Sequence, residues 1–128
     1  MIYLDTSVAL AQLLAEDKQP HDSLWSETLV SSRLLEYEGW TRIHARGLSV
    51  SHGEALRLLL GRVAMLELVP AVLVRALDPF PVPVRTLEAI HLASLEFLRT
   101  QRQHVELASY DDRMLAAARA MGIPVAAA

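Results

Sequence analysis

The chain opens with Met1-Ile-Tyr-Leu-Asp-Thr-Ser7, and this stretch decides how the rest of the sequence folds. Its first four residues are apolar and rich in strand formers, and the apolar, helix-favouring run Val8–Leu14 follows directly. The order predicts a strand, a cap and a helix. We expect Asp5, Thr6 or Ser7 to cap the helix, because each side chain can accept a bond from its first N–H groups. Ligands bind at the carboxyl ends of parallel strands, so Asp5 also lies at a candidate site.

Length and composition limit the classes of protein to which the chain can belong. Its 128 residues suit a single domain covering residues 1–128. The absence of cysteine excludes disulfide bonds, thiolate metal sites and cysteine nucleophiles. No apolar stretch approaches the roughly 18 residues of a membrane span, and Met1 leads into the predicted strand without a basic leader. We therefore expect a cytoplasmic protein with no membrane partner.

The net charge of −3 does not decide whether the protein binds nucleic acid. Binding to phosphates usually needs a basic surface, which argues against such a partner. If four of the 15 acidic residues belong to a metal site, however, 12 basic and 11 acidic residues remain, a balance of about +1. Eleven of the 12 basic residues are arginines, whose planar guanidinium is well suited to phosphate.

Strand and helix patterns alternate along the whole chain. After the first strand, further strands are predicted at 28–32, 66–70, 104–110 and 123–125. Helices are predicted at about 33–46, 51–63, 72–77, 85–99 and 112–121, and the proline-rich stretch 78–83 is a loop. Gly47 and Gly122 are placed to end two of these helices. The alternation predicts a three-layer α/β/α fold, with a mostly parallel sheet of four to five strands and helices on both faces.

Four acidic residues are expected to meet at one edge of this sheet. Asp5 and Asp111 follow predicted strands, while Glu36 and Glu88 lie in the first turn of helices that begin at the same edge. Two carboxylates about 5 Å apart repel by roughly 3 kcal/mol at an effective dielectric near 20, and a divalent cation removes that repulsion. Oxygen ligands without cysteine select Mg²⁺ or Mn²⁺, which activates water for phosphodiester hydrolysis. Taken singly, each acid also fits a helix cap or a solvated face.

In order along the chain, four blocks resemble those of PIN domains, and in particular the VapC-type toxins of bacterial and archaeal toxin–antitoxin pairs. The resemblance spans nearly the whole chain, and the four blocks in sequence are specific although each alone is weak. The blocks are Leu4-Asp-Thr-Ser7, Ser32-x-x-x-Glu36, Leu87-Glu-Ala-Ile-His-Leu-Ala93, and Ser109-Tyr-Asp-Asp-Arg-Met-Leu-Ala-Ala117 with Gly122-Ile-Pro124.

This resemblance implies a Mg²⁺-dependent endoribonuclease toxin, for which Mn²⁺ substitutes, inhibited by a cognate antitoxin protein and acting as a homodimer. The family's four acids fall on Asp5, Glu36, Glu88 and Asp111. The first, third and fourth of these are the implied metal ligands. Thr6 or Ser7 falls on the supporting hydroxyl position beside the metal. One position departs from the pattern, since relatives commonly carry aspartate where this chain has Glu88.

Two other functions remain open from the sequence. A nuclease-dead PIN-like domain that only binds RNA or a protein is favoured by the glutamate at position 88. A phosphohydrolase acting on small molecules would need a phosphate-binding loop, and the sequence has none. His91 lies one helical turn after Glu88, where a hydrogen-bonded packing histidine is expected rather than a ligand or a base.

Overall fold

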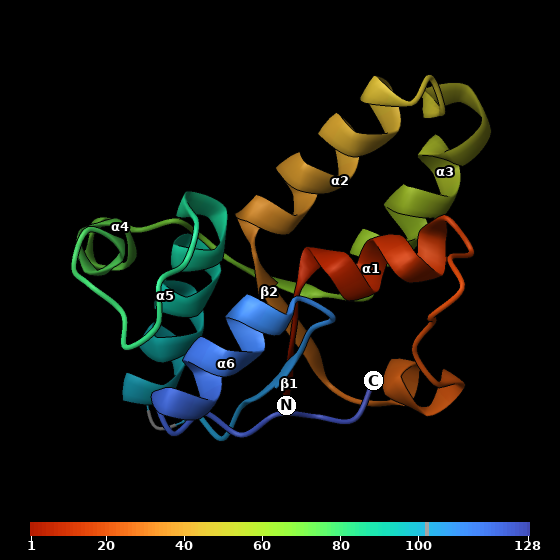
Figure 1. Ribbon diagram of the computed structural model, residues 1–128. Helices are drawn as coiled ribbons and strands as arrows, with labels where there is room; N and C mark the ends of the chain where they lie inside the picture. Colours follow the sequence, from red (N-terminus) through yellow and green to blue (C-terminus); the bar gives the residue numbers. More distant parts are fainter. Residues whose placement is uncertain (102) are drawn as a thin grey trace.

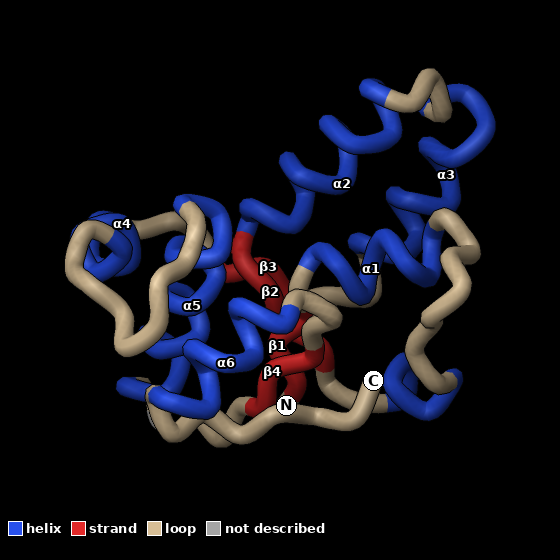
Figure 2. Tube along the Cα trace, viewed as in Figure 1, coloured by secondary structure: helices blue, strands red, loops and turns tan. Residues whose placement is uncertain are grey.

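A parallel sheet lies at the centre of the molecule, between helices on both of its faces (Figures 1 and 2). The computed structural model describes residues 1–101 and 103–128. Its four strands are β1 (Ile2–Leu4), β2 (Leu29–Ser32), β3 (Ala64–Leu66) and β4 (Glu106–Ala108). They are arranged in the order β3-β2-β1-β4, and each neighbouring pair is parallel. The predicted α/β class and the parallel sheet are therefore confirmed.

Helices follow the strands in the predicted alternation. They are α1 (Thr6–Leu13), the short 3₁₀ helix η1 (Asp22–Ser26), α2 (Arg33–Ala45), α3 (Ser49–Leu60), α4 (Pro70–Ala76), α5 (Thr86–Thr100) and α6 (Asp112–Ala120). Gly47 and Gly122 follow α2 and α6 with φ of +67° and +72°, as expected of glycines that end helices. Among the described residues, no helix has the length and apolar character needed to cross a membrane.

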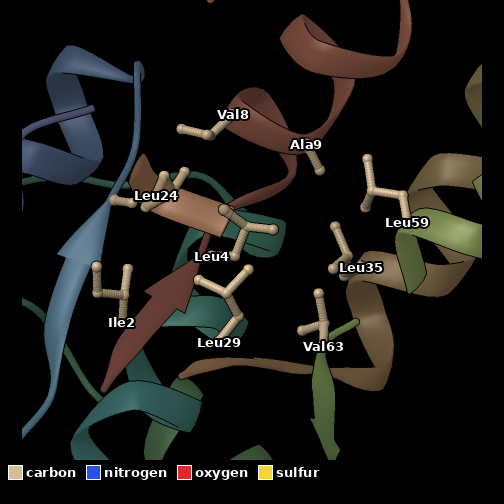
Figure 3. Close-up of a cluster of buried hydrophobic side chains, with 10 residues drawn as sticks. Ile2, Leu4, Val8, Ala9, Leu24, Leu29, Leu35, Leu59 and Val63 are labelled. Carbon is tan, nitrogen blue, oxygen red and sulfur yellow. The ribbon is translucent and has the colours of Figure 1, made fainter. Parts of the chain in front are cut away.

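Successive side chains of β1 point to opposite faces of the sheet, and the hydrophobic core has one part on each face. Ile2 and Leu4 pack on one face with residues of α1, α2 and α3, as Figure 3 shows. Tyr3 points to the opposite face and packs with residues of α5 and α6. Because successive side chains of a strand point to opposite faces, a strand of three residues can anchor both layers. The three-layer α/β/α prediction is thus confirmed.

Three predicted element boundaries are wrong. β3 ends at Leu66 rather than extending to 70, because Pro70 opens α4, where its fixed φ favours the first helical turn. Helix α3 begins at Ser49 rather than at residue 51, and the hydroxyl of Ser51 donates to the carbonyl of Leu48. The predicted strand at 123–125 is reduced to a single parallel bridge between Leu107 and Val125.

Candidate active site

A pocket of about 280 Å³ opens beside the carboxyl ends of β1 and β4. Its walls come from the starts of α1, α5 and α6 and from the second turn of α2, so segments far apart in sequence meet there. The lining residues are Asp5, Thr6, Ser7, Leu10, Glu16, Glu38, Arg42, Leu87, Glu88, His91, Tyr110, Asp111 and Met114. Three of the four predicted acids, namely Asp5, Glu88 and Asp111, are in this set, and so are the predicted hydroxyls of Thr6 and Ser7.

Asp5 occupies the N-cap position of α1, but its carboxylate does not cap the helix. Its Oδ2 accepts hydrogen bonds from the hydroxyls of Ser7, at 2.6 Å, and Ser109, at 2.8 Å. The residue is 4% exposed, so burial of this charge requires such donors. Oδ1 lies 3.8 Å from Nε2 of His91. The carboxylate is therefore fixed through one oxygen, while the other faces a histidine at the pocket.

Asp111 both caps α6 and borders the pocket. Its Oδ1 accepts from the backbone N–H groups of Arg113, at 2.9 Å, and Met114, at 3.1 Å. Its own N–H donates to Ser109 Oγ at 2.9 Å, and this hydroxyl is the one that bonds Asp5. The neighbouring acid, Asp112, is the exposed first residue of α6.

Glu88 is buried at the start of α5 and lines the pocket together with Asp111. Its Oε1 accepts the N–H of Arg85 at 2.7 Å and lies 3.2 Å from Nε of Arg113. Burial raises the pKa of Glu88, and the neighbouring side chain of Asp111 raises it further. Burial also opposes ionisation of Asp111, but the side chain of Glu88 and the N–H groups of Met114 and Arg113 hold its pKa below the ordinary value. The pKa values of these two neighbouring acids are thus shifted in opposite directions, and a bound cation would favour the ionised form of both.

Two further carboxylates line the pocket, those of Glu16, after the end of α1, and of Glu38, on α2. The side chain of Glu38 is held by hydrogen bonds. Its Oε1 accepts the hydroxyl of Thr6 at 2.7 Å and lies 2.6 Å from Nε2 of His91. Burial alone would raise the pKa of Glu38, but these two partners, together with the charge of Arg42, lower it. The side chain is therefore an ionised carboxylate, anchored through one of its oxygens.

The structure does not bring Glu36 to this pocket, so the predicted convergence of four acids is wrong at that position. Glu36 forms an ion pair with Arg33 at 3.1 Å and lines a separate shallow hollow beside Trp40. Two residues turn an α-helix by about 200°, which puts Glu36 and Glu38 on opposite sides of α2. Glu38 takes the place predicted for Glu36.

A signal for Glu38 was present in the sequence. Glu38 and Arg42 are separated by four residues, and side chains at that spacing share one face of a helix. Because arginine is suited to phosphate, an acid one turn before Arg42 on the same face is a candidate for the same site. Arg33 and Glu36 are separated by three residues and share the other face, where they pair with each other.

The histidine below the pocket is fully hydrogen-bonded, as the sequence predicts. Nδ1 of His91 pairs with the hydroxyl of Tyr3 at 2.7 Å, and Nε2 faces Glu38 and Thr6. Burial disfavours the imidazolium, but the Tyr3 hydroxyl and the carboxylates of Glu38 and Asp5 raise the pKa of His91 to about 10.

The donor set of the pocket fits a hard divalent cation. No group of three or more histidine, aspartate or glutamate side chains in residues 1–101 and 103–128 is already arranged to hold a metal ion. Mg²⁺ needs no such cage, since it commonly keeps several waters and binds through one or two carboxylates. The carboxylates of Asp5, Glu88 and Asp111, which line the same pocket, supply oxygen ligands of this kind.

Comparison with known proteins finds sequence similarity over nearly the whole chain. The sequence is 30% identical to Ribonuclease VapC47 of Mycobacterium tuberculosis (strain CDC 1551 / Oshkosh) over 133 residues, which cover 98% of this chain and 96% of that protein. No protein-family model matches the chain, and no solved structure matches it significantly. The similarity therefore extends over the sheet, its helices and the pocket together.

Proposed function

The chain belongs to the VapC family of PIN-domain toxins, and on this premise we propose that it is a cytoplasmic, Mg²⁺-dependent endoribonuclease in which Mn²⁺ substitutes. The observation that carries the proposal is the convergence of carboxylates in one pocket, four of which follow β1 and β4 or lie in the first two turns of α2 and α5. We assign the acidic site to Asp5, Glu38, Glu88 and Asp111, with Glu38 in the place expected for Glu36.

Each residue of the pocket has a distinct part in the proposed hydrolysis. Asp5, Glu88 and Asp111 would hold the metal, which when bound lowers the pKa of a coordinated water and offsets charge on the phosphate. The free oxygen of Glu38 would orient the attacking water. Thr6 and Ser7 support the site by donating hydrogen bonds to the carboxylates of Glu38 and Asp5.

Positive charge beside the acidic pocket supports a phosphate-bearing substrate. Arg42 lines the pocket on the same face of α2 as Glu38, and its side chain is exposed. In the described residues Arg42 forms no ion pair within 4.0 Å, unlike Arg33 on the opposite face, which pairs with Glu36 and Glu67. An exposed guanidinium at this place suits an RNA phosphate, which it can bind through two N–H groups.

The metal dependence of cleavage tests this function. We expect the purified chain to cut total RNA with Mg²⁺ or Mn²⁺ and to lose this activity in EDTA, because its pocket supplies the ligands but not the charge that stabilises the phosphate. Gel analysis of the products, with re-addition of Mg²⁺ after chelation, is the measurement. RNA binding without cleavage under every metal condition would reject the nuclease and support the alternative, a PIN-like binding module.

We also propose two protein partners, a cognate antitoxin and a second copy of this chain. For the second copy, we propose the apolar surface around the groove between α4 and the loop before α5 as the interface. Leu77 is 84% exposed there, and Asp78 and Arg85 supply opposite charges that two copies related by a two-fold axis can pair. We expect light scattering to give the mass of a dimer for the wild type and of a monomer for Leu77→Glu. A wild-type monomer would contradict the dimer.

A further inference from the structure

We propose that His91, held in place by Tyr3, is a positioning residue that keeps one oxygen of Glu38 anchored and the other turned into the pocket. The inference rests on the proposed nuclease function, because it assigns a task to a residue that neither touches the substrate nor binds the metal. The proposal is argued from the hydrogen bonds that link Tyr3 to His91 and connect His91 and Thr6 to Glu38 at the wall of the pocket.

These residues come from four separate elements, and His91 lies where the elements meet. Tyr3 belongs to β1, Thr6 to α1, Glu38 to α2 and His91 to α5. The imidazole is 2% exposed, and both of its nitrogens have partners, at 2.7 Å on Tyr3 Oη and at 2.6 Å on Glu38 Oε1. The rings of Tyr3 and His91 also meet edge to face, with centroids 5.7 Å apart. The orientation of the His91 ring is thus fixed by its contacts with Tyr3 of the sheet.

The bonds to Glu38 distinguish its two oxygens. Because Glu38 is ionised, it can only accept, so Nε2 of His91 carries a proton and donates it to Oε1. Thr6 Oγ1 donates to the same oxygen. In the part of the chain that the structure describes, no hydrogen bond reaches Oε2. Two donors thus converge on one oxygen and leave the other to the pocket.

A histidine that only filled space would not need this arrangement. An apolar side chain of similar size packs as well in a buried position, without the free-energy cost of burying polar atoms. If His91 only packs, leucine should replace it better than glutamine does. If it positions Glu38, glutamine should replace it better, because its amide retains a donor near the place of Nε2.

The decisive experiment compares His91→Gln with His91→Leu. We expect kcat for RNA cleavage to fall by roughly ten- to a hundredfold in His91→Leu, with KM for RNA little changed. Losses of this size are typical for residues that hold the ligands of a metal site in position through hydrogen bonds. His91→Gln should recover most of that loss although it is no more heat-stable than His91→Leu. Crystal structures of the two variants should show Glu38 bonded to Thr6 in His91→Gln and displaced in His91→Leu. Equal activity and an unmoved Glu38 in both variants would overturn the proposal.

Tyr3→Phe keeps the proposal testable if His91→Leu does not fold. This change removes one hydroxyl and leaves the packed ring, so we expect kcat to fall by about three- to tenfold, as when a buried hydrogen bond is lost. Tyr37→Phe is the matched control, because Tyr37 is 67% exposed on α2 and its hydroxyl is outside the network. An effect of Tyr3→Phe no larger than that of the control would overturn the proposal. A wild type without RNA cleavage would instead reject the nuclease function, and the inference with it.

Discussion

Glu38→Gln is expected to reduce RNA cleavage by about two to three orders of magnitude, because several kcal/mol of transition-state stabilisation depend on the charged groups of a metal site. Glutamine can keep the bonds from Thr6 and His91 through its Oε1, so the fold should be unchanged. What the variant loses is the negative charge and the second carboxylate oxygen. Initial rates on a labelled RNA, at saturating Mg²⁺, measure the effect.

Glu36→Gln is the matched control for this substitution. The same chemical change two residues earlier removes only an exposed ion pair with Arg33, which still pairs with Glu67 at 2.8 Å. Such surface pairs contribute about 0–1 kcal/mol to stability, and we expect cleavage to stay within about twofold of the wild type. A large loss in Glu36→Gln with an active Glu38→Gln would contradict the assignment of Glu38 to the site.

Asp5→Asn should abolish measurable cleavage and growth arrest, a fall of about three orders of magnitude or more. The amide oxygen can accept the hydroxyls of Ser7 and Ser109, which now bond Oδ2, so the junction between β1 and α1 is retained. The other oxygen, Oδ1, which we propose binds the metal, is replaced by an NH₂ group, which cannot bind a cation. The two measurements are RNA cleavage in vitro and colony counts after induced expression.

Asp112→Asn controls for the loss of one negative charge near the pocket. Asp112 is exposed at the start of α6 and is absent from the lining residues. We expect this variant to cleave RNA and to arrest growth like the wild type. Circular dichroism of both variants should match that of the wild type. Full activity in a folded Asp5→Asn protein would remove Asp5 from the catalytic site.

The fold could be predicted from the sequence because its signals are local. The apolar start of the chain, the proline-rich loop and the glycines that end helices each act over a few residues. The ends of strands and helices were harder to predict where the sequence patterns of two elements overlapped. At Pro70 a strand-like run overlaps the first turn of a helix, and the preference of proline for that turn decides the outcome.

The site was predictable only in part, because it depends on the rotation of helices about their axes. Asp5 follows β1 directly and Asp111 lies three residues after the end of β4, so these parallel neighbours bring them to one edge. Glu36 and Glu38 are both within the first two turns of α2, and only the packing of that helix decides which one faces the pocket. The buried network under Glu38 joins positions 53 and 88 residues apart, and no local pattern indicates such pairs.

The hydrogen bond from Ser109 to Asp5 joins two residues 104 positions apart, so the pocket is complete only when the segment after β4 has folded against the start of the chain. A chain cleaved by a protease before Ser109 keeps the hydroxyl of Ser7 on Asp5 but loses the second hydroxyl that orients this carboxylate. Limited proteolysis at that segment should therefore impair any activity housed in the pocket.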